Sequence, residues 1–191
     1  MGHKINDTIF ETFPNLESER LLFRSFSEKD AYDLFKIRSD DSLLEYMDTN
    51  KMSSVDEANR LIEAINTAYN EKRGINWKII EKDKLKMIGY FGVWRIIREH
   101  CWGEIGYVIK TPFQRMGYMQ ETFSVLLPFA FNCIGLHRLE ANINPNNKKS
   151  ISLVEKNGFR KEAYFRENYL FNGKFLDSLI YSLLETEYVR P

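Results

Sequence analysis

Residues 101–123, CWGEIGYVIKTPFQRMGYMQETF, run from a strand-like segment through a polar turn into an apolar helix. The turn holds Pro112, Gln114, Arg115 and Gly117, which is more than a simple structural turn requires. It ends at a helix N-terminus, where free backbone N–H groups and the positive end of the helix dipole bind anions. A long turn rich in N–H groups suits a diphosphate, and Gly117 lets the backbone approach it closely. The stretch therefore predicts an anion-binding turn that joins a strand to a helix.

Two common nucleotide-binding motifs are missing from this sequence. No Gly-Lys-Ser or Gly-Lys-Thr follows the turn, which excludes a nucleotide P-loop. The pattern Gly-x-Gly-x-x-Gly is also missing, which argues against dinucleotide binding.

The composition is that of a globular domain. The chain has 191 residues, of which 43% are hydrophobic and 28% charged, enough to bury one core. Lys+Arg and Asp+Glu each number 27, a balance that argues against direct nucleic-acid binding. No apolar run is long enough for a signal peptide or a membrane span, and Cys101 and Cys133 lack metal-site spacing. We expect a cytoplasmic protein with no metal and no membrane partner.

Hydrophobic periodicity divides the chain into helices and strands. Helical spacing predicts four helices, at 27–40, 54–74, 121–135 and 147–158. Strand-like runs occupy 20–26, 75–82, 86–97, 101–110, 137–144, 159–171 and 174–185. We expect Gly74 to end the second helix, Pro128 to kink the third, and Asn172-Gly173 to form a hairpin turn. The aromatic side chains of the run 164–171 are expected to pack in the core and sheet.

The order of these elements predicts a mixed α/β fold. An antiparallel front half is followed by one crossover helix between the fourth and fifth strands, so those two strands are expected to run parallel. Ligands in such sheets bind outside the carboxyl ends of the strands. The turn at 111–117 and the loop NINPNNKKS at 142–150 both follow such ends, so we expect them to share one site.

Two longer segments resemble a known family. The segments GEIGYVIKTPFQRMGYMQE (103–121) and GLHRLEANINPNNKKSISLVEKNGF (135–159) resemble the GNAT superfamily of acetyl-CoA-dependent N-acetyltransferases, and within it the Rim-type ribosomal-protein N-acetyltransferases. The resemblance covers nearly the whole chain and implies a single N-acetyltransferase domain over residues 1–191. It implies a GNAT-like fold of mixed α/β (α+β) class. That fold has a mostly antiparallel sheet of about seven strands, a splayed parallel pair at strands 4 and 5, and about four flanking helices.

The resemblance also implies an acetyl-CoA site. The family's pyrophosphate loop, Gln/Arg-x-x-Gly-x-Gly/Ala, matches Gln114, Arg115, Met116, Gly117, Tyr118 and Met119, with Gln120 next to it. Backbone groups of Tyr107, Val108 and Ile109 would pair with the pantetheine amides as an added strand does. Asn147 and Ser150 match an Asn-x-x-Ser motif that also contacts the cofactor. Met119 stands where the family usually has Gly or Ala, so its side chain must point away from the diphosphate.

Two residues are the candidate catalytic groups. Many GNAT enzymes carry a tyrosine acid at the position of Val154, and in the Rim-type branch the matching serine, here Ser150, lies near the cofactor sulfur instead. Glu104, on the strand beside the cleft, is the candidate general base that takes a proton from the attacking amine. Each of these residues also has a purely structural interpretation. Glu104 is then a solvent-facing strand residue, and Ser150 and Asn147 only cap a helix.

The predicted reaction is transfer of an acetyl group from acetyl-CoA to a primary amine, by direct attack in a ternary complex. The connection SDDSLLEYMDTNKMS (39–53) contains Asp40, Asp41, Glu45 and Asp48, and such an acidic lip favours a cationic acceptor. That acceptor is a basic protein N-terminus or a small cationic amine, and the chain is a monomer or a homodimer. The alternative is a non-catalytic GNAT-like module that binds acyl-CoA. Two features favour this alternative: Met119, and the absence of a tyrosine at the position of Val154.

Overall fold

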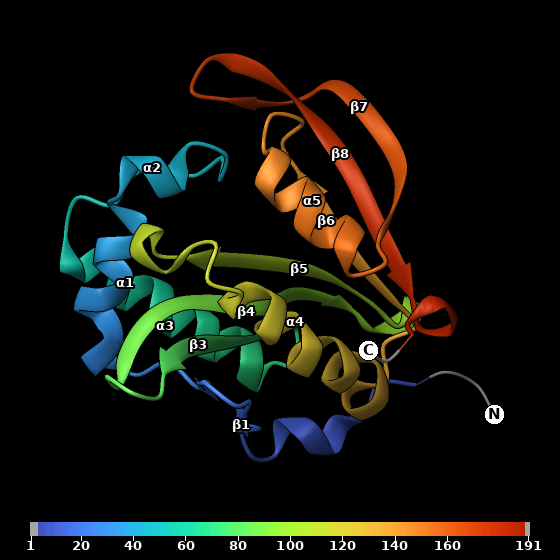
Figure 1. Cartoon of the computed structure of the whole chain (residues 1–191), viewed down its shortest axis with the longest axis horizontal. Helices are drawn as coiled ribbons and strands as arrows, with labels where there is room; N and C mark the ends of the chain where they lie inside the picture. The colour runs from blue at the N-terminus through green and yellow to red at the C-terminus, as the bar shows by residue number, and fades with distance from the viewer. Residues whose placement is uncertain (1–3, 190–191) are drawn as a thin grey trace.

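A single twisted sheet of eight strands runs through the molecule (Figure 1). The computed structural model describes residues 4–189, so residues 1–3 and 190–191 of the predicted domain lie outside the described residues. The strands are β1 (Leu16–Glu17), β2 (Leu21–Arg24), β3 (Ile75–Glu81), β4 (Lys86–Ile97), β5 (Trp102–Ile109), β6 (Arg138–Ile143), β7 (Arg160–Phe171) and β8 (Lys174–Leu184). Their order across the sheet is β1-β2-β3-β4-β5-β6-β8-β7.

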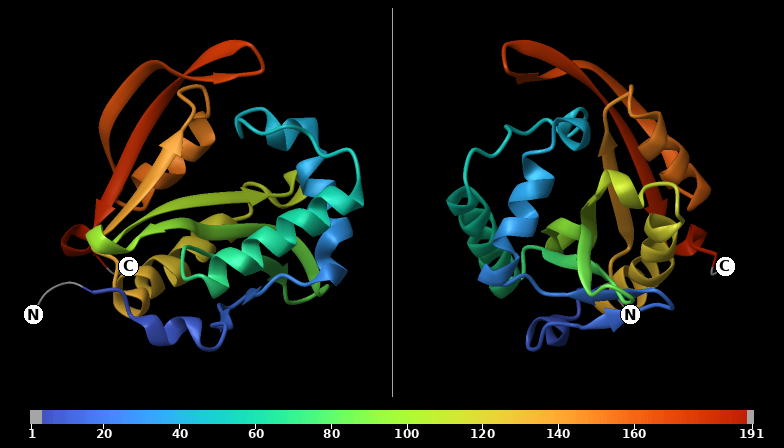
Figure 2. Two further views of the ribbon diagram at one scale, coloured as in Figure 1. Left: turned by 180° about the vertical axis from the view of Figure 1, so that it is seen from behind. Right: turned by 60° about the vertical axis from the view of Figure 1, so that its left-hand side comes forward.

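Helices cover both faces of this sheet (Figure 2). The α-helices are α1 (Ala31–Arg38), α2 (Asp41–Leu44), α3 (Val55–Asn70), α4 (Tyr118–Phe129) and α5 (Lys148–Lys156). Residues of α4 and α5 pack into the larger core with most of the sheet, whereas α1 and α3 enclose a smaller core on the opposite face. In α4 and its extension, the apolar residues at helical spacing are buried: Phe123, Leu126, Leu127, Ala130, Phe131 and Ile134. Among residues 4–189, no helix combines the length and apolarity that crossing a membrane requires.

The predicted fold class and the parallel pairing of the fourth and fifth predicted strands are confirmed. Six strand pairs are antiparallel, and β5 pairs with β6 in parallel. These two strands are the fourth and fifth of the prediction, with α4 as the crossover helix between them. The two additional elements, β1 and α2, are two and four residues long, too short to leave a period in the sequence.

Two predictions about single elements need correction. The second helix ends at Asn70, and the left-handed residue after it is Lys72 (φ 58°), so Gly74 does not end it. A Cβ on Gly74 would lie 2.6 Å from the carbonyl oxygen of Trp94, so close packing of the backbone explains this glycine. The third helix begins at Tyr118, three residues before the predicted start, and two residues after Pro128 it changes into a π-turn (Ala130–Ile134).

The β7–β8 hairpin arches over one end of the sheet (Figure 1). Asn172 (φ 47°) and Gly173 (φ 76°) form its turn, as predicted for an Asn-Gly pair. The aromatic residues of β7 do not all pack in the core: the side chains of Tyr164 and Phe165 are 47% and 49% exposed. Because β7 is the edge strand, only β8 covers it.

Gly89 is expected to be essential for the fit of β4 against β5. A Cβ at this position would lie 2.2 Å from the carbonyl oxygen of Val108, a backbone atom that cannot move away alone. We predict that Gly89→Ala lowers the free energy of unfolding by about 2 to 3 kcal/mol, measured by chemical denaturation. Gly106→Ala is the matched control, because its Cβ would meet only the half-exposed Trp94 side chain, at 3.3 Å. Equal losses in the two variants would contradict this account.

Candidate active site

The strands β5 and β6 stay paired over only three residues. Trp102, Gly103 and Glu104 face Arg138, Leu139 and Glu140 in parallel register, and beyond Glu104 the strands separate. The ribbon shows β5 continuing toward α2 while β6, α5 and β8 rise away from it (Figure 1). Backbone groups of Ile105–Ile109 that would otherwise pair with β6 therefore face an opening.

A cavity lies in this opening between β5 and β6. Its volume is about 710 Å³, which is typical of a site for a small molecule or cofactor. Most of the predicted cofactor-binding residues line it. These are Tyr107, Val108, Ile109, Gln114, Arg115, Gly117, Tyr118, Met119, Gln120, Asn147 and Ser150. Met116 and Glu104 are not among the lining residues.

The turn before α4 presents free backbone donors to the cavity. Arg115 (φ 62°) and Gly117 (φ 80°) both adopt the left-handed region, which folds the turn back on itself. None of the amide N–H groups of residues 115–120 donates to a protein acceptor within the described chain. These N–H groups therefore form an anion-binding site at the positive end of the α4 dipole.

Arg20 on the neighbouring β-strand edge holds this turn in place. Its Nη1 donates to the carbonyl oxygen of Met116 at 3.1 Å, and its Nε donates to Glu121 at 2.7 Å. Glu121 also accepts from the Ser18 hydroxyl at 2.6 Å and from the Arg20 amide at 2.8 Å. Burial opposes ionisation of Glu121, but these hydrogen bonds outweigh it and hold its pKa below the usual range. The turn is thus anchored to a segment about 100 residues earlier in the chain.

The charges around the cavity favour an anionic ligand. The cationic lining side chains are Arg115, Lys148, Lys149 and Lys156, and Glu45 is the one carboxylate among the lining residues. Lys149 donates to the amide oxygen of Gln114 at 3.2 Å, and Gln114 in turn donates to the Ile109 carbonyl at 3.2 Å. This chain of contacts joins α5 to the end of β5.

Met119 belongs mostly to the core. It is 8% exposed and is a member of the larger core, although it is also among the residues that line the cavity. Val154 is fully buried in the same core and offers no hydroxyl to the cavity. Gln120 exchanges amide hydrogen bonds with Asn157, of 2.7 and 3.1 Å, and so connects α4 to α5.

Glu104 lies at the last paired position, on the sheet face opposite α4. Its side chain is 13% exposed and lies 3.9 Å from the Arg95 guanidinium, so it is not a plain solvent-facing residue. Burial raises the pKa of Glu104, Glu140 raises it further, and Arg95 lowers it. A partly buried carboxylate with a raised pKa is a suitable proton acceptor near neutral pH.

Ser150 lies in the first turn of α5, facing β5. The Asn147 side chain caps this helix and accepts from the Ser150 amide at 3.1 Å, so the capping interpretation of Asn147 is correct. The Ser150 hydroxyl is not used by the cap and lines the cavity. Tyr107 lines the cavity beside it, and burial raises the pKa of its phenol to about 12, while Ser150 opposes the rise.

Sequence reasoning missed one wall of the cavity. The segment around α2 contributes Ser42, Leu43, Glu45, Tyr46 and Met47. Asp40 caps α2 by accepting from the Ser42 amide at 2.9 Å, and the Ser42 hydroxyl lies 3.2 Å from that of Thr111. The acidic composition of 39–53 drew attention to the segment, but no local pattern placed it over the cofactor turn.

A metal site is not part of this arrangement. Across residues 4–189, no three His, Cys, Asp or Glu side chains gather where they could hold a metal ion.

Comparisons with known proteins agree with this geometry. The family described as "Acetyltransferase (GNAT) domain" matches residues 20–160. The chain is 34% identical to the uncharacterized N-acetyltransferase YoaA of Bacillus subtilis, over 91% of this chain and 98% of that one. It is 26% identical to the [ribosomal protein uS5]-alanine N-acetyltransferase of Escherichia coli, over 62% of each chain.

Solved structures share the fold. A GNAT-family acetyltransferase from Bacillus anthracis is 26% identical, with a TM-score of 0.81 over 91% of this chain and all of that one. The spermidine N-acetyltransferase of Vibrio cholerae, in complex with CoA and spermine, is 20% identical, with a TM-score of 0.79 over 90% and 99% of the two chains. At that identity the likeness shows the fold alone.

The Glu121 network generates a prediction about stability. Glu121→Gln removes the charge that orders Ser18 and Arg20, so we expect the free energy of unfolding to fall by about 2 kcal/mol at pH 7. The pKa of Glu121 is lowered in the folded protein, so the stabilisation by its charge is complete above the pKa of an unfolded glutamate, about 4.3. That stabilisation is lost as the pH falls below this value. Denaturation of both proteins between pH 7 and pH 3 should therefore show a shrinking difference.

Glu71→Gln is the matched control for this experiment. Glu71 pairs with Arg73 at the surface, where both side chains are more than half exposed, so a change within about 0.5 kcal/mol is expected. A Glu121→Gln variant as stable as the wild type at pH 7 would show that the network does not hold the turn.

Proposed function

This chain belongs to the GNAT acetyltransferase family and is an acetyl-CoA-dependent N-acetyltransferase, and from that premise we propose that its acceptor is a positively charged primary amine. The acceptor attacks directly in a ternary complex. The separation of β5 from β6 after Glu104 carries this proposal. It lets the cofactor cavity on the α4 face meet an acceptor that arrives from the opposite face.

The cavity residues fit acetyl-CoA. Free N–H groups of residues 115–120 and the nearby lysines suit its phosphates, and the unpaired edge of β5 suits its pantetheine amides. Acetyl-CoA supplies the thioester carbonyl that the amine attacks. A backbone N–H of the open β5 segment is the candidate donor to the carbonyl oxygen.

Glu104 acts as the general base in this proposal. An α-amino group has a pKa of about 8 and a lysine of about 10.4, so the amine must lose a proton before or during attack. Glu104 points to the face opposite Tyr107, because residues three apart on a strand lie on opposite faces. It therefore takes the amine's proton on the acceptor side, directly or through water.

Ser150 stabilises the leaving sulfur. Its hydroxyl points into the cavity at the N-terminus of the nine-residue helix α5, where the helix dipole favours negative charge. The Asn147 cap keeps this turn in position without using the hydroxyl.

The acceptor's charge is inferred from the acidic lip. Three of its carboxylates already have partners: Asp40 caps α2, Asp41 pairs with Lys51, and Asp48 accepts from Tyr169 of β7. Glu45 lines the cavity. The contact between Asp48 and Tyr169 joins the α2–α3 connection to the hairpin above the opening. The lip keeps a negative excess that attracts a cation.

Two kinds of cationic amine suit such a lip. One relative acetylates a ribosomal-protein alanine and one structural neighbour a polyamine, so both a basic protein N-terminus and a polyamine are candidate acceptors. The burial of Met119, at 8% exposed, weakens the case for the alternative of a non-catalytic acyl-CoA module.

Cofactor binding is the first expected outcome. Calorimetric titration should show micromolar binding of acetyl-CoA and of CoA, and no binding of ATP, because ATP has no pantetheine to pair with β5. Failure of both CoA species to bind would refute the site. Thiol release in the presence of N-terminal peptides or spermidine then separates the two acceptor classes.

Glu104→Gln is expected to lower kcat about 100-fold while CoA affinity stays within twofold. In the wild type, kcat should fall as the pH drops through the raised pKa of Glu104, which lies above the value of about 4.3 for an exposed glutamate. This acidic limb should disappear in the variant. Glu63→Gln, on the exposed side of α3, is the matched control and should leave kcat unchanged. Wild-type turnover in Glu104→Gln would remove Glu104 from the mechanism.

A further inference from the structure

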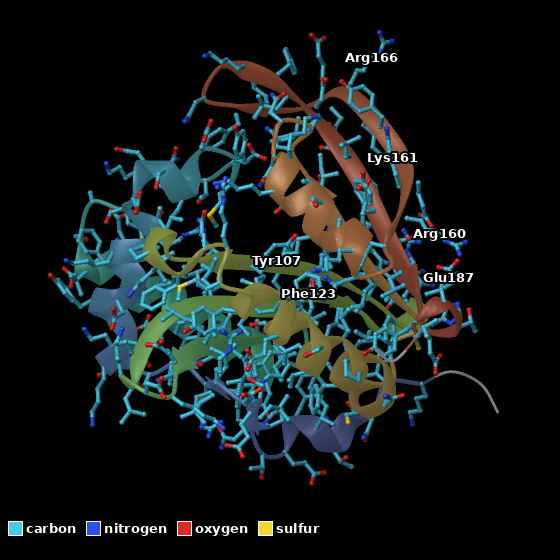
Figure 3. The ribbon with its side chains drawn as sticks, in the orientation of Figure 1. Tyr107, Phe123, Arg160, Lys161, Arg166 and Glu187 are labelled. Atoms are coloured by element: carbon cyan, nitrogen blue, oxygen red, sulfur yellow. The ribbon has the colours of Figure 1, made fainter. Side chains whose placement is uncertain are left out.

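Tyr107 of β5 carries a buried hydroxyl without a partner. Its oxygen is sealed from solvent and makes no hydrogen bond of normal length and angle with any described residue. The ring is held by a parallel contact with Phe91 at 6.2 Å and an edge contact with Phe123 of α4 at 5.1 Å. Figure 3 shows Tyr107 and Phe123 close together between β5 and α4. Because buried polar groups are almost always satisfied, this unpaired hydroxyl requires an explanation.

Packing alone does not explain a tyrosine at this position. A phenylalanine would make the same ring contacts with Phe91 and Phe123 and would leave no hydroxyl unsatisfied. Tyr107 and Ser150 both line the cavity. Ser150 lies near enough to the phenol to oppose the rise that burial causes in its pKa, although the two hydroxyls form no hydrogen bond of ordinary geometry.

We propose that Tyr107 is a positioning residue for acetyl transfer, whose phenol donates a hydrogen bond to Ser150 Oγ and so directs the Ser150 hydroxyl at the sulfur of the bound thioester. This inference rests on the proposed function and adds one residue to it. A serine hydroxyl has one hydrogen and two lone pairs. When Oγ accepts from Tyr107, its own hydrogen is left for the sulfur, and each bond strengthens the other.

The chemistry balances without a proton from Tyr107. The C–N bond forms while the C–S bond breaks, the sulfur leaves with the bonding electron pair, and the amine's proton goes to Glu104. A phenol whose pKa is raised to about 12 is a weaker acid than a thiol of pKa about 8.5. It therefore keeps its proton and donates only a hydrogen bond. Ser150 likewise stabilises the thiolate, which solvent protonates after release.

Tyr107→Phe tests this arrangement. We expect kcat to fall 10- to 100-fold, with the KM for acetyl-CoA and the affinity for CoA within twofold. In a Ser150→Ala background the same change should lower kcat less than twofold, because no hydroxyl is left to position. The melting temperature of the ligand-free variant should equal or exceed that of the wild type, because an unsatisfied hydroxyl is removed.

Tyr69→Phe is the matched control. The Tyr69 hydroxyl donates to the Ile9 carbonyl at 3.0 Å, and neither residue lines the cavity, so its loss should lower the melting temperature and leave kcat unchanged. A merely structural Tyr107 would behave in the same way as Tyr69.

The pKa of the CoA thiol, measured from thiolate absorbance in the CoA complex, separates this inference from the proposed function. It should rise in Tyr107→Phe and in Ser150→Ala, even if every amine tested fails as an acceptor of the wild-type enzyme. An unchanged thiol pKa and kcat in Tyr107→Phe, or full additivity with Ser150→Ala, would overturn the positioning role. A wild type that binds no CoA would overturn both proposals.

Discussion

The short pairing of β5 with β6 is the constraint on which the rest of the structure depends. Only Trp102–Glu104 pair with Arg138–Glu140, because β6 is held along its whole length by β8, which carries the β7–β8 hairpin away from β5. The backbone of β5 beyond Glu104 is thereby left with an open edge. The cavity, the turn before α4 and the first turn of α5 all lie around that edge.

Glu104 and Tyr107 show that β5 presents side chains to both faces of the sheet beside this opening. The two residues are three apart on β5, so the side-chain alternation of a strand sends them to opposite faces. Tyr107 packs against α4 beside the cofactor cavity, whereas Glu104 faces Arg95 on the other side. The proposed base Glu104 on one face and the hydroxyl groups of Tyr107 and Ser150 on the other suit the proposed reaction, in which the acceptor and the cofactor approach from opposite faces of the sheet.

Much of the fold was predictable because its signals are local. Hydrophobic periods, Ser54 and Asn147 as caps, and the Asn172-Gly173 turn each act within a few residues, and the observed elements follow them. Gly74 misled the prediction because a glycine after a helix usually ends it, whereas here it lets the chain pass close to the Trp94 carbonyl. Such an approach depends on a strand 20 residues later and leaves no local mark.

The sequence by itself determined the order of elements, the crossover between β5 and β6, and the motif residues of the cofactor turn, because periodicity and turn chemistry act over short distances. Tertiary structure alone decided which groups come together: Arg20 and the Met116 carbonyl, α2 and the cavity, and Tyr107 and Ser150 as lining residues of the same cavity. It also decided that Met119 is buried in the core. These outcomes depend on packing between segments far apart in the chain, where burial and hydrogen-bond partners are set by the whole fold.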